Sequence, residues 1–398
     1  MAAAPVPALG PRAGVDYPNS MSQFLDWFHS DADCWAYLAR LRWADGFSCP
    51  RCGPGEAWIS TRHLYICSAC QKQTSVLAGT IFEKTRLPLL VWFRAIWFVT
   101  ASKSGVSAKE LQRELGIGYR AAWLMQHKMR LAMKRPGRDS DRLSGDIEVD
   151  ESYLGGPAPG GKRGRGAEGK LIIAIAAERL GFGARSKRWA LGRTRMQVIE
   201  NTSAETLLDF IEDTCEKGST IYTDGLSAYA GVASRGYIHD ATAISKGADP
   251  AHVVLPAVHR VASLLKRWLM GTHHGGIGAQ HAEAYLDEFV FRFNRRKSTS
   301  RGLLFYRLLQ NAVIIPKQNY ELIVLSRRGP QAGKRRGVPK VHPYSRTAIT
   351  NTPTPRRAKP AAAESPAVKT PATPASPPTP ATPPTSPRTR RKRPPKRP

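Results

Sequence analysis

The amino-acid sequence predicts an α/β protein in which a mixed sheet with helices follows a small cysteine-rich ribbon and a helical segment. Three observations predict it: two Cys-x-x-Cys pairs, a helical apolar pattern behind them, and a change to strand-like alternation from Gly145. A basic, proline-rich stretch ends the chain. We divide the sequence into a flexible start, a helix with the ribbon, a helical segment, the sheet-containing part and a disordered tail, with the bounds 1–18, 19–80, 81–140, 141–325 and 326–398.

The net charge of +29 is not explained by the tail alone. From Arg346 to Pro398, 12 Lys and Arg stand against Glu364, so the rest of the chain still carries +18. Such a balance attracts phosphate backbones and predicts salt-sensitive binding. A basic surface that serves only solubility is the alternative interpretation.

The sequence predicts neither a membrane span nor a signal peptide. Leu87 to Ala101 is the apolar segment closest to a span, but Arg94 interrupts it and it is shorter than the roughly 18 residues required. The first 18 residues lack a basic region followed by an apolar core. We therefore expect a cytoplasmic protein.

Two cysteine pairs predict a zinc ribbon behind one or two short helices in residues 19–45. Each pair places two thiolates on one tight turn, and two pairs complete a tetrahedral zinc shell. Strands at 57–60 and 63–66 would form the hairpin between them. Disulfides are the alternative, but the chain shows no secretory context. The expected zinc ligands are Cys49, Cys52, Cys67 and Cys70, whereas Cys34 and Cys215 are expected to be buried apolar residues.

The next segment is predicted to be helical. Residues 85–101 indicate a core helix, and Ser107-Ala-Lys-Glu110 is a capping box that begins the following one. Gly116-Ile-Gly118 then leads into a second helix, and the pair resembles a helix-turn-helix. An ordinary helical hairpin with a solvated basic face fits equally well. The basic residues of that second helix are Arg120, Lys128, Arg130 and Lys134.

Alternating residues from Gly145 predict the first strand of the sheet. Ile147 and Val149 would face one side, and Glu148 and Asp150 the other. Further strands are expected at 170–177, 189–199 and 219–223, with a helix at 203–216 before the last one. Three strands, a helix and a fourth strand, with an Asp near the ends of the first and the fourth, form the layout of an RNase H-like domain.

The two aspartates of this layout are Asp150 and Asp224. A carboxylate at such a strand end is either a solvated edge residue or a ligand for a hard divalent cation. Its recurrence on a second strand favours the metal site. Beyond Asp224 we expect helices at 258–270, 281–294 and 303–314. The tail holds 15 of the 31 prolines after Asn351 and should be disordered.

Several stretches resemble one protein family. The stretch Asp-Ile-Glu-Val-Asp-Glu-Ser-Tyr-Leu-Gly-Gly at 146–156, together with 222–229 and 258–273, resembles the ISXO2-like transposases of the IS1595 insertion-sequence family. The run Tyr-Leu-Asp-Glu-Phe-Val-Phe-Arg-Phe-Asn-Arg-Arg at 285–296 is the most specific part. The ribbon is similar to the one that these proteins carry before their catalytic domain, and the resemblance spans about Ser22 to Asn311.

The resemblance implies a DNA transposase of the DDE superfamily with an RNase H-like core. Such an enzyme binds the terminal inverted repeats of its element and target DNA, works as a homo-oligomer, and uses two Mg²⁺ or Mn²⁺ ions for cleavage and strand transfer. Asp150 matches the first acidic position and Asp224 the second. Within a bacterial cytoplasm, such a protein associates with the nucleoid when it is bound to DNA.

The third metal ligand departs from the pattern of related transposases, where a Glu commonly occupies it. Counting 35 residues from Asp224 gives His259, with Lys266 seven residues later. In this family the position also takes Asn or His, so His259 is the candidate, as a neutral imidazole. It could equally bind phosphate or pack at a helix start. Glu288 is the alternative third acid, unless it only pairs with Arg292.

Basic residues near this constellation are candidates for DNA phosphate contacts, although each could be a solvated surface charge. They are Lys266, Arg292, Arg295 and Arg296, with Lys162, Arg163 and Arg165 in the glycine-rich loop at 155–169. The missing Glu keeps a second function open, a catalytically decayed or domesticated transposase that acts as a DNA-binding protein. A nuclease for RNA hybrids is a third, but it would not need the ribbon.

Overall fold

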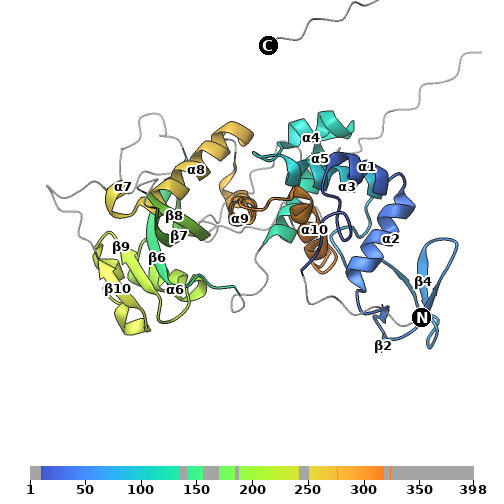
Figure 1. The fold of residues 1–398 in the computed structure, drawn as a ribbon, viewed down its shortest axis with the longest axis horizontal. Coiled ribbons are helices and arrows are strands. Elements are labelled where there is room, and N and C mark those ends of the chain that lie inside the picture. Colours follow the sequence, from blue (N-terminus) through green and yellow to red (C-terminus); the bar gives the residue numbers. More distant parts are fainter. Residues whose placement is uncertain are drawn as a thin grey trace, which may run out of the picture. The chain divides into compact units, whose positions relative to one another are not determined.

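The computed structural model describes residues 10–134, 141–155, 170–183, 188–241, 251–275, 277–317 and 323. The glycine-rich loop with Lys162, Arg163 and Arg165, and the proline-rich tail, lie outside these residues. The described helices and strands are coloured along the chain in Figure 1. Within the described part, no helix is long and apolar enough to cross a membrane.

Helices from both ends of the described chain share one apolar core. Its members are α1 (Met21–Trp27), α2 (Asp31–Arg42), α3 (Leu89–Ala101), α4 (Ala108–Leu115), α5 (Tyr119–Met133) and α10 (Arg301–Ala312). Phe305 of α10 contacts Phe28 and Phe93, with ring centroids 6.0 and 5.7 Å away. Gly302, the second residue of α10, lies close against Pro18. Only glycine fits there, because a Cβ at this position would lie 1.7 Å from the Pro18 carbonyl oxygen. Residues 301–312, which we expected to extend the sheet-containing part, therefore complete the helical core.

The ribbon consists of short strands that follow α2. β1 (Ser48–Cys49) pairs with β2 (Gly53–Pro54), and β3 (Ala57–Ile59), β4 (Leu64–Cys67) and β5 (Gln73–Ser75) form a three-stranded antiparallel sheet. The predicted hairpin is therefore present.

A capping box and a glycine define the helical hairpin of α4 and α5. Ser107 and Glu110 form the predicted box, and Gly116 ends α4 in the left-handed region with φ 62°. The expected basic face on α5 is wrong for two residues. Lys128 is buried and donates to the Ile81 carbonyl at 2.9 Å, and Arg130 is buried against Glu288. Helix α5 is thus largely a core helix.

The five-stranded sheet has the order β10-β9-β6-β7-β8. β6 (Asp146–Leu154), β7 (Leu171–Gly183) and β8 (Arg188–Ile199) are antiparallel neighbours, whereas β9 (Thr220–Thr223) runs parallel to β6, and β10 (Ile238–Ala241) parallel to β9. This is a mixed sheet, as predicted.

Helices cover both faces of this sheet (Figure 1). Ile147 and Val149 point to the face of α6 (Ala204–Thr214) and the short helix η1 (Ser227–Tyr229). The opposite face carries α8 (Pro256–His273) and α9 (Ala282–Asn294). Since alternate residues of β6 point to opposite faces, Glu148 and Asp150 lie on the side of α8. The remaining short elements are η2 (Ala233–Arg235), α7 (Ala251–Val254) and η3 (Ala279–His281).

Candidate active site and metal centre

The four ribbon cysteines meet at one point. Their Sγ atoms all lie within 4.8 Å of one another, and the Sγ atoms of Cys49 and Cys70 are 3.7 Å apart. The backbone N–H of Arg51 donates to Cys49 Sγ at 3.4 Å and is the main cause that lowers the pKa of that thiol. All six cysteines are free, and Cys34 and Cys215 are buried as expected. Four converging thiols fit a closed structural zinc site.

The sheet brings the two candidate aspartates to the same level. In the parallel pair of β6 and β9, the register runs from Asp146 opposite Thr220 to Glu148 opposite Tyr222. Two residues further along each strand lie Asp150 and Asp224. Both carboxylates accept a local backbone N–H, Asp150 from Glu151 at 2.8 Å and Asp224 from Leu226 at 3.0 Å. These bonds restrain the two side chains. The expectation that Asp150 lies near a strand end is wrong, because β6 continues to Leu154, whereas Asp224 directly follows β9.

Helix α8 brings His259 to this edge. Its Nε2 atom is 3.6 Å from Asp150 Oδ2, and the two side chains are 34 % and 16 % exposed. One imidazole and two carboxylates suit a divalent cation that accepts oxygen and nitrogen donors. Among the described residues, however, only the four cysteines form a group of three or more Cys, His, Asp and Glu with all ligand atoms within 4.8 Å. The structure therefore brings His259 to Asp150 without gathering all three side chains that closely.

Glu148 lies beneath this edge and is fully buried. Its Oε2 accepts the N–H groups of Ala257 at 2.6 Å and Val258 at 2.9 Å, and its Oε1 is 3.4 Å from Arg179 Nε. Burial raises the pKa of Glu148 to about 7, against the lowering effect of these partners. No role for Glu148 was predicted from the sequence. The available signal was its place on the face of Asp150, together with an α8 start that has no capping side chain.

Glu151 points to the other face of the sheet, as the alternation predicts. The hydroxyl of Tyr229 donates to its Oε1 at 2.6 Å, and burial holds the pKa of this tyrosine well above its ordinary value. Tyr229 belongs to the core under α6. Glu151 therefore ties η1 to β6 next to Asp150.

Glu288, the alternative third acid, has its contacts elsewhere. It is buried, and its Oε2 accepts from Arg130 Nε at 2.8 Å, so it joins α9 to α5. The Arg130 guanidinium also lies 3.8 Å from the ring centroid of Tyr285. Of the two candidates for the third ligand, only His259 has a described contact with Asp150.

Three of the four candidate DNA-binding cations bond to backbone carbonyls instead. Arg292 donates to Val99, Ser102 and Lys103 at the end of α3, and its burial lowers its pKa. Arg295 donates to Phe291 at 3.1 Å, and Arg296 donates to Gly192 at 3.0 Å and to Leu191. Lys266, by contrast, is exposed on α8, seven residues or about two turns after His259.

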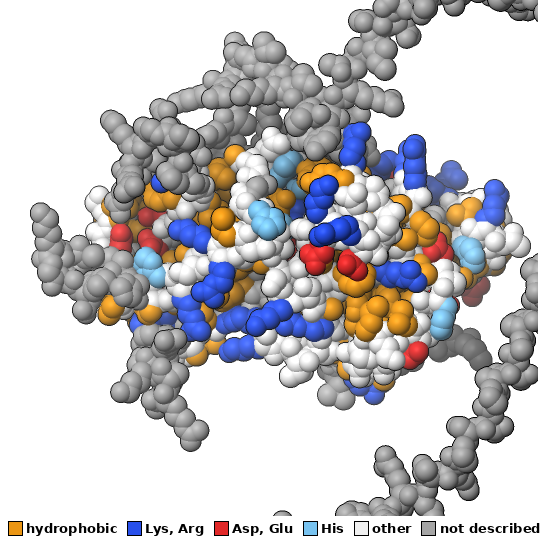
Figure 2. All heavy atoms as spheres, turned by 90° about the horizontal axis from the view of Figure 1, so that it is seen from above, with side chains coloured by type: hydrophobic (Ala, Val, Ile, Leu, Met, Phe, Trp, Pro, Cys, Tyr) orange, Lys and Arg blue, Asp and Glu red, His pale blue; other side chains and the backbone are white. Residues whose placement is uncertain are grey.

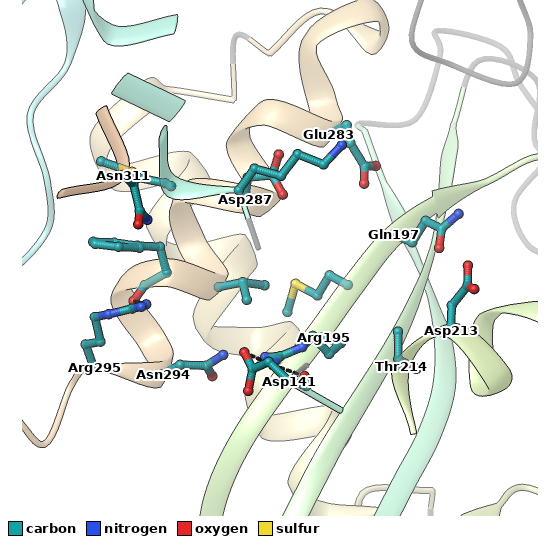
Figure 3. A pocket seen from close by; sticks show the side chains of 15 residues that line it. Asp141, Arg195, Gln197, Asp213, Thr214, Glu283, Asp287, Asn294, Arg295 and Asn311 are labelled. Atoms are coloured by element: carbon teal, nitrogen blue, oxygen red, sulfur yellow. Dashed lines mark hydrogen bonds and ion pairs between the residues drawn. The ribbon is translucent and has the colours of Figure 1, made fainter. Parts of the chain in front are cut away.

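A cavity of about 520 Å³ lies between β8, α9 and the ends of α5 and α6. Figure 3 shows Asp141 and Arg195 facing each other, joined by a bond of 2.5 Å, with Glu283 and Asp287 on α9. Glu283 accepts the Val198 N–H at 2.9 Å. Several polar side chains of this cavity are thus used in joining the sheet to its surroundings, and none of the predicted metal ligands lines it.

Comparison with known proteins defines the class of this chain. Residues 142–294 match the model of the ISXO2-like transposase domain, and residues 29–73 match that of the transposase zinc-ribbon domain. These two matches show a transposase-family relationship for the ribbon and for the sheet-containing part of the chain. Both matching domains are those of the IS1595 family, so the resemblance found in the sequence is confirmed.

One curated relative shares most of its length with this chain. It is a protein of the transposable element ISH50 of Halobacterium salinarum (strain ATCC 700922 / JCM 11081 / NRC-1). The two sequences are 28 % identical over 280 residues, which make up 64 % of this chain and 88 % of the relative. This similarity agrees with the two domain matches.

Proposed function

We propose that this chain is a DDE-type DNA transposase whose RNase H-like core, within residues 141–325, cleaves and joins DNA strands at the terminal inverted repeats of its element. The observation that carries the proposal is the parallel register of β6 and β9, which sets Asp150 and Asp224 at one level, with His259 3.6 Å from Asp150. The strand order, with three antiparallel strands followed by two parallel ones, is that expected of an RNase H-like sheet.

In this proposal, Asp150 and Asp224 hold two Mg²⁺ or Mn²⁺ ions, and His259 completes the ligands. When bound, such a pair of ions would supply the chemistry that activates a water or a 3′-hydroxyl and stabilises the leaving oxygen of an in-line attack. The backbone donors to Asp150 and Asp224 restrain the two carboxylates. Neutral His259 offers its Nε2 on the side of Asp150.

The basic surface supplies the attraction for DNA. Figure 2 shows Lys and Arg side chains spread over one face of the molecule, with acidic side chains in a few small groups. Lys266 is the candidate for a phosphate contact near the site, since Arg292 and Arg296 already bond to carbonyl oxygens. The ribbon and the helical core would bind the terminal repeats, and paired ends would require a homo-oligomer.

Substitution of the aspartates tests the proposal. We expect Asp150→Asn and Asp224→Asn to bind the terminal repeats like the wild type but to lose cleavage with Mg²⁺ or Mn²⁺. Asp146→Asn is the matched control, because this residue lies on the same strand four positions earlier and should leave cleavage intact. Cleavage retained in both site variants would refute the metal assignment.

A strand-transfer assay with pre-cut ends separates this function from a decayed transposase that only binds DNA. The wild-type chain should yield joined product that depends on the divalent ion. Binding without any joined product would favour the decayed protein, the alternative that the absence of Glu at position 259 keeps open.

A further inference from the structure

Helix α8 begins without a capping side chain of its own. Its N-cap residue is Leu255, which makes no side-chain hydrogen bond, and Pro256 occupies the first turn. The first N–H groups of a helix have no partner inside it, and an N-cap side chain ordinarily accepts those of the second or third position. In this helix these donors belong to Ala257 and Val258.

Glu148 of β6 takes the place of that missing cap. Its Oε2 accepts both N–H groups, at 2.6 and 2.9 Å, from a side chain with 0 % exposure. A carboxylate at this position also suits the positive end of the helix dipole. Arg179 of β7 approaches the other oxygen of the Glu148 carboxylate, Oε1. The Arg179 guanidinium also lies 4.3 Å from the ring centroid of Tyr222 on β9, so the carboxylate is restrained from both neighbouring strands.

The same two elements also carry two of the three candidate metal ligands. Asp150 follows Glu148 by two residues on β6, and His259 follows Val258 directly on α8. The cap and the Asp150–His259 contact are therefore two adjacent connections between one strand and one helix start. Loss of the Glu148 cap would therefore release the start of α8, which carries His259, the partner of Asp150.

We infer that Glu148 is a positioning residue, which caps α8 from the sheet, holds His259 beside Asp150 and so sets the affinity of the site for its metal without touching it. This inference rests on the proposed function, because it takes Asp150 and His259 as ligands. Glu148 is the one wholly buried acidic residue on the face of β6 that points toward α8, and the inference gives this residue a role.

Hydrogen exchange of the full-length, metal-free chain tests the cap. In Glu148→Ala, the amides of residues 257–262 should exchange at least tenfold faster than in the wild type. Glu178→Gln is the matched control, since Glu178 is a buried carboxylate on the adjacent strand that bonds to Arg193 and to the Ser144 N–H. Unchanged exchange in Glu148→Ala would overturn the cap. If that variant does not fold, Glu148→Met, which keeps the length of the side chain but has no oxygen to accept the two N–H groups, decides by the same comparison.

Titration with Mn²⁺ alone, followed by electron paramagnetic resonance of the free ion, tests the positioning. Glu148→Ala should bind Mn²⁺ about 10- to 100-fold more weakly, as other residues that orient metal ligands do. In a His259→Ala background the same change should weaken binding no further, because Glu148 acts through His259. Mn²⁺ affinity like that of Glu178→Gln, or additive losses in the double variant, would overturn the inference. If Asp150→Asn also binds Mn²⁺ like the wild type, the proposed function itself has failed.

Discussion

At the scale of single residues, His259 and Glu288, the two candidates for the third metal ligand, differ in their surroundings. His259 is partly exposed and approaches Asp150, whereas Glu288 is buried in an ion pair with Arg130. A buried carboxylate that neutralises a buried guanidinium cannot leave it without leaving an uncompensated charge behind. We therefore propose His259 as the third ligand, whereas Glu288 joins α5 to α9 through Arg130.

These assignments predict opposite phenotypes. His259→Ala should keep the free energy of unfolding near that of the wild type but raise the Mn²⁺ concentration needed for half-maximal cleavage. Glu288→Ala should lower the free energy of unfolding by about 3 to 5 kcal/mol, because Arg130 stays buried without its partner. Urea unfolding and metal titrations of cleavage measure the two effects. Arg130→Met combined with Glu288→Leu is the control and should recover most of the stability. Normal stability with lost cleavage in Glu288→Ala would reverse the assignment.

His127 makes the stability depend on pH. Burial lowers its pKa to about 2, and the nearby Arg130 charge contributes in the same direction. Below pH 6.5 the unfolded chain binds a proton at this residue that the folded chain does not bind, so stability falls progressively from pH 6.5 toward pH 2. The loss should reach about 1.4 kcal/mol at pH 5.5. His127→Gln should remove this part of the pH dependence in urea unfolding between pH 7.5 and 5.5.

The exposed His29 provides the control for that measurement. His29→Gln should follow the wild-type pH profile, because the His29 side chain is exposed in the folded chain. His273, whose pKa burial lowers to about 4, should leave a residual slope in His127→Gln. An unchanged profile in His127→Gln would show that this imidazole is not held neutral.

At the scale of elements, the ribbon depends on its metal more than on its core. Its strands have two to four residues, and the aromatic side chains at its base, such as Trp43, Phe47 and Tyr65, form one small stack. Strands this short bury little apolar area, so zinc binding must contribute much of the folding free energy.

Removal of two ligands should therefore unfold the ribbon alone. The purified chain should hold one zinc per protomer, and Cys49→Ser combined with Cys67→Ser should release it. Hydrogen exchange should then rise over about residues 45–75 while β6 to β9 stay protected. Cys34→Ala is the control, because Cys34 is buried among the helices and not a ligand, so it should retain the zinc. Unchanged metal content in the double variant would refute the zinc site.

The elements themselves could be predicted from the sequence wherever their signal was local. Alternation gave β6, the capping box at Ser107 gave α4, and the cysteine spacing gave the ribbon. The ends of β7 and α3 were less well predicted, because they depend on neighbouring strands and helices. The hydrogen bonds from Arg292 to the carbonyl oxygens at the end of α3 join residues about 190 positions apart in the sequence. No local sequence pattern predicts such a contact.

At the scale of the whole molecule, the same limit applies to the core and the site. Helix α10 joins helices that precede it by some 200 residues, although the sequence predicted only a helix at 303–314 and not its partners. For the site, Asp150 and Asp224 followed from strand order, and His259 from a family spacing. The cap by Glu148 did not, because it requires knowing which helix start lies above which strand.

The net charge of the whole chain follows directly from its composition and predicts how DNA binding depends on salt. Seven Lys and Arg lie between Arg388 and Arg397, within a chain of net charge +29. Replacing these seven with Gln in the full-length chain should flatten the salt dependence of DNA binding, by about 0.9 in the slope of log K against log salt for each lost phosphate contact. Because phosphate contacts carry no sequence information, affinity for terminal repeats and for unrelated DNA should fall alike. Filter-binding at several salt concentrations measures both, with Ser and Thr of the same tail changed to Ala as the control. An unchanged slope would show that the charge of the folded part alone holds the DNA.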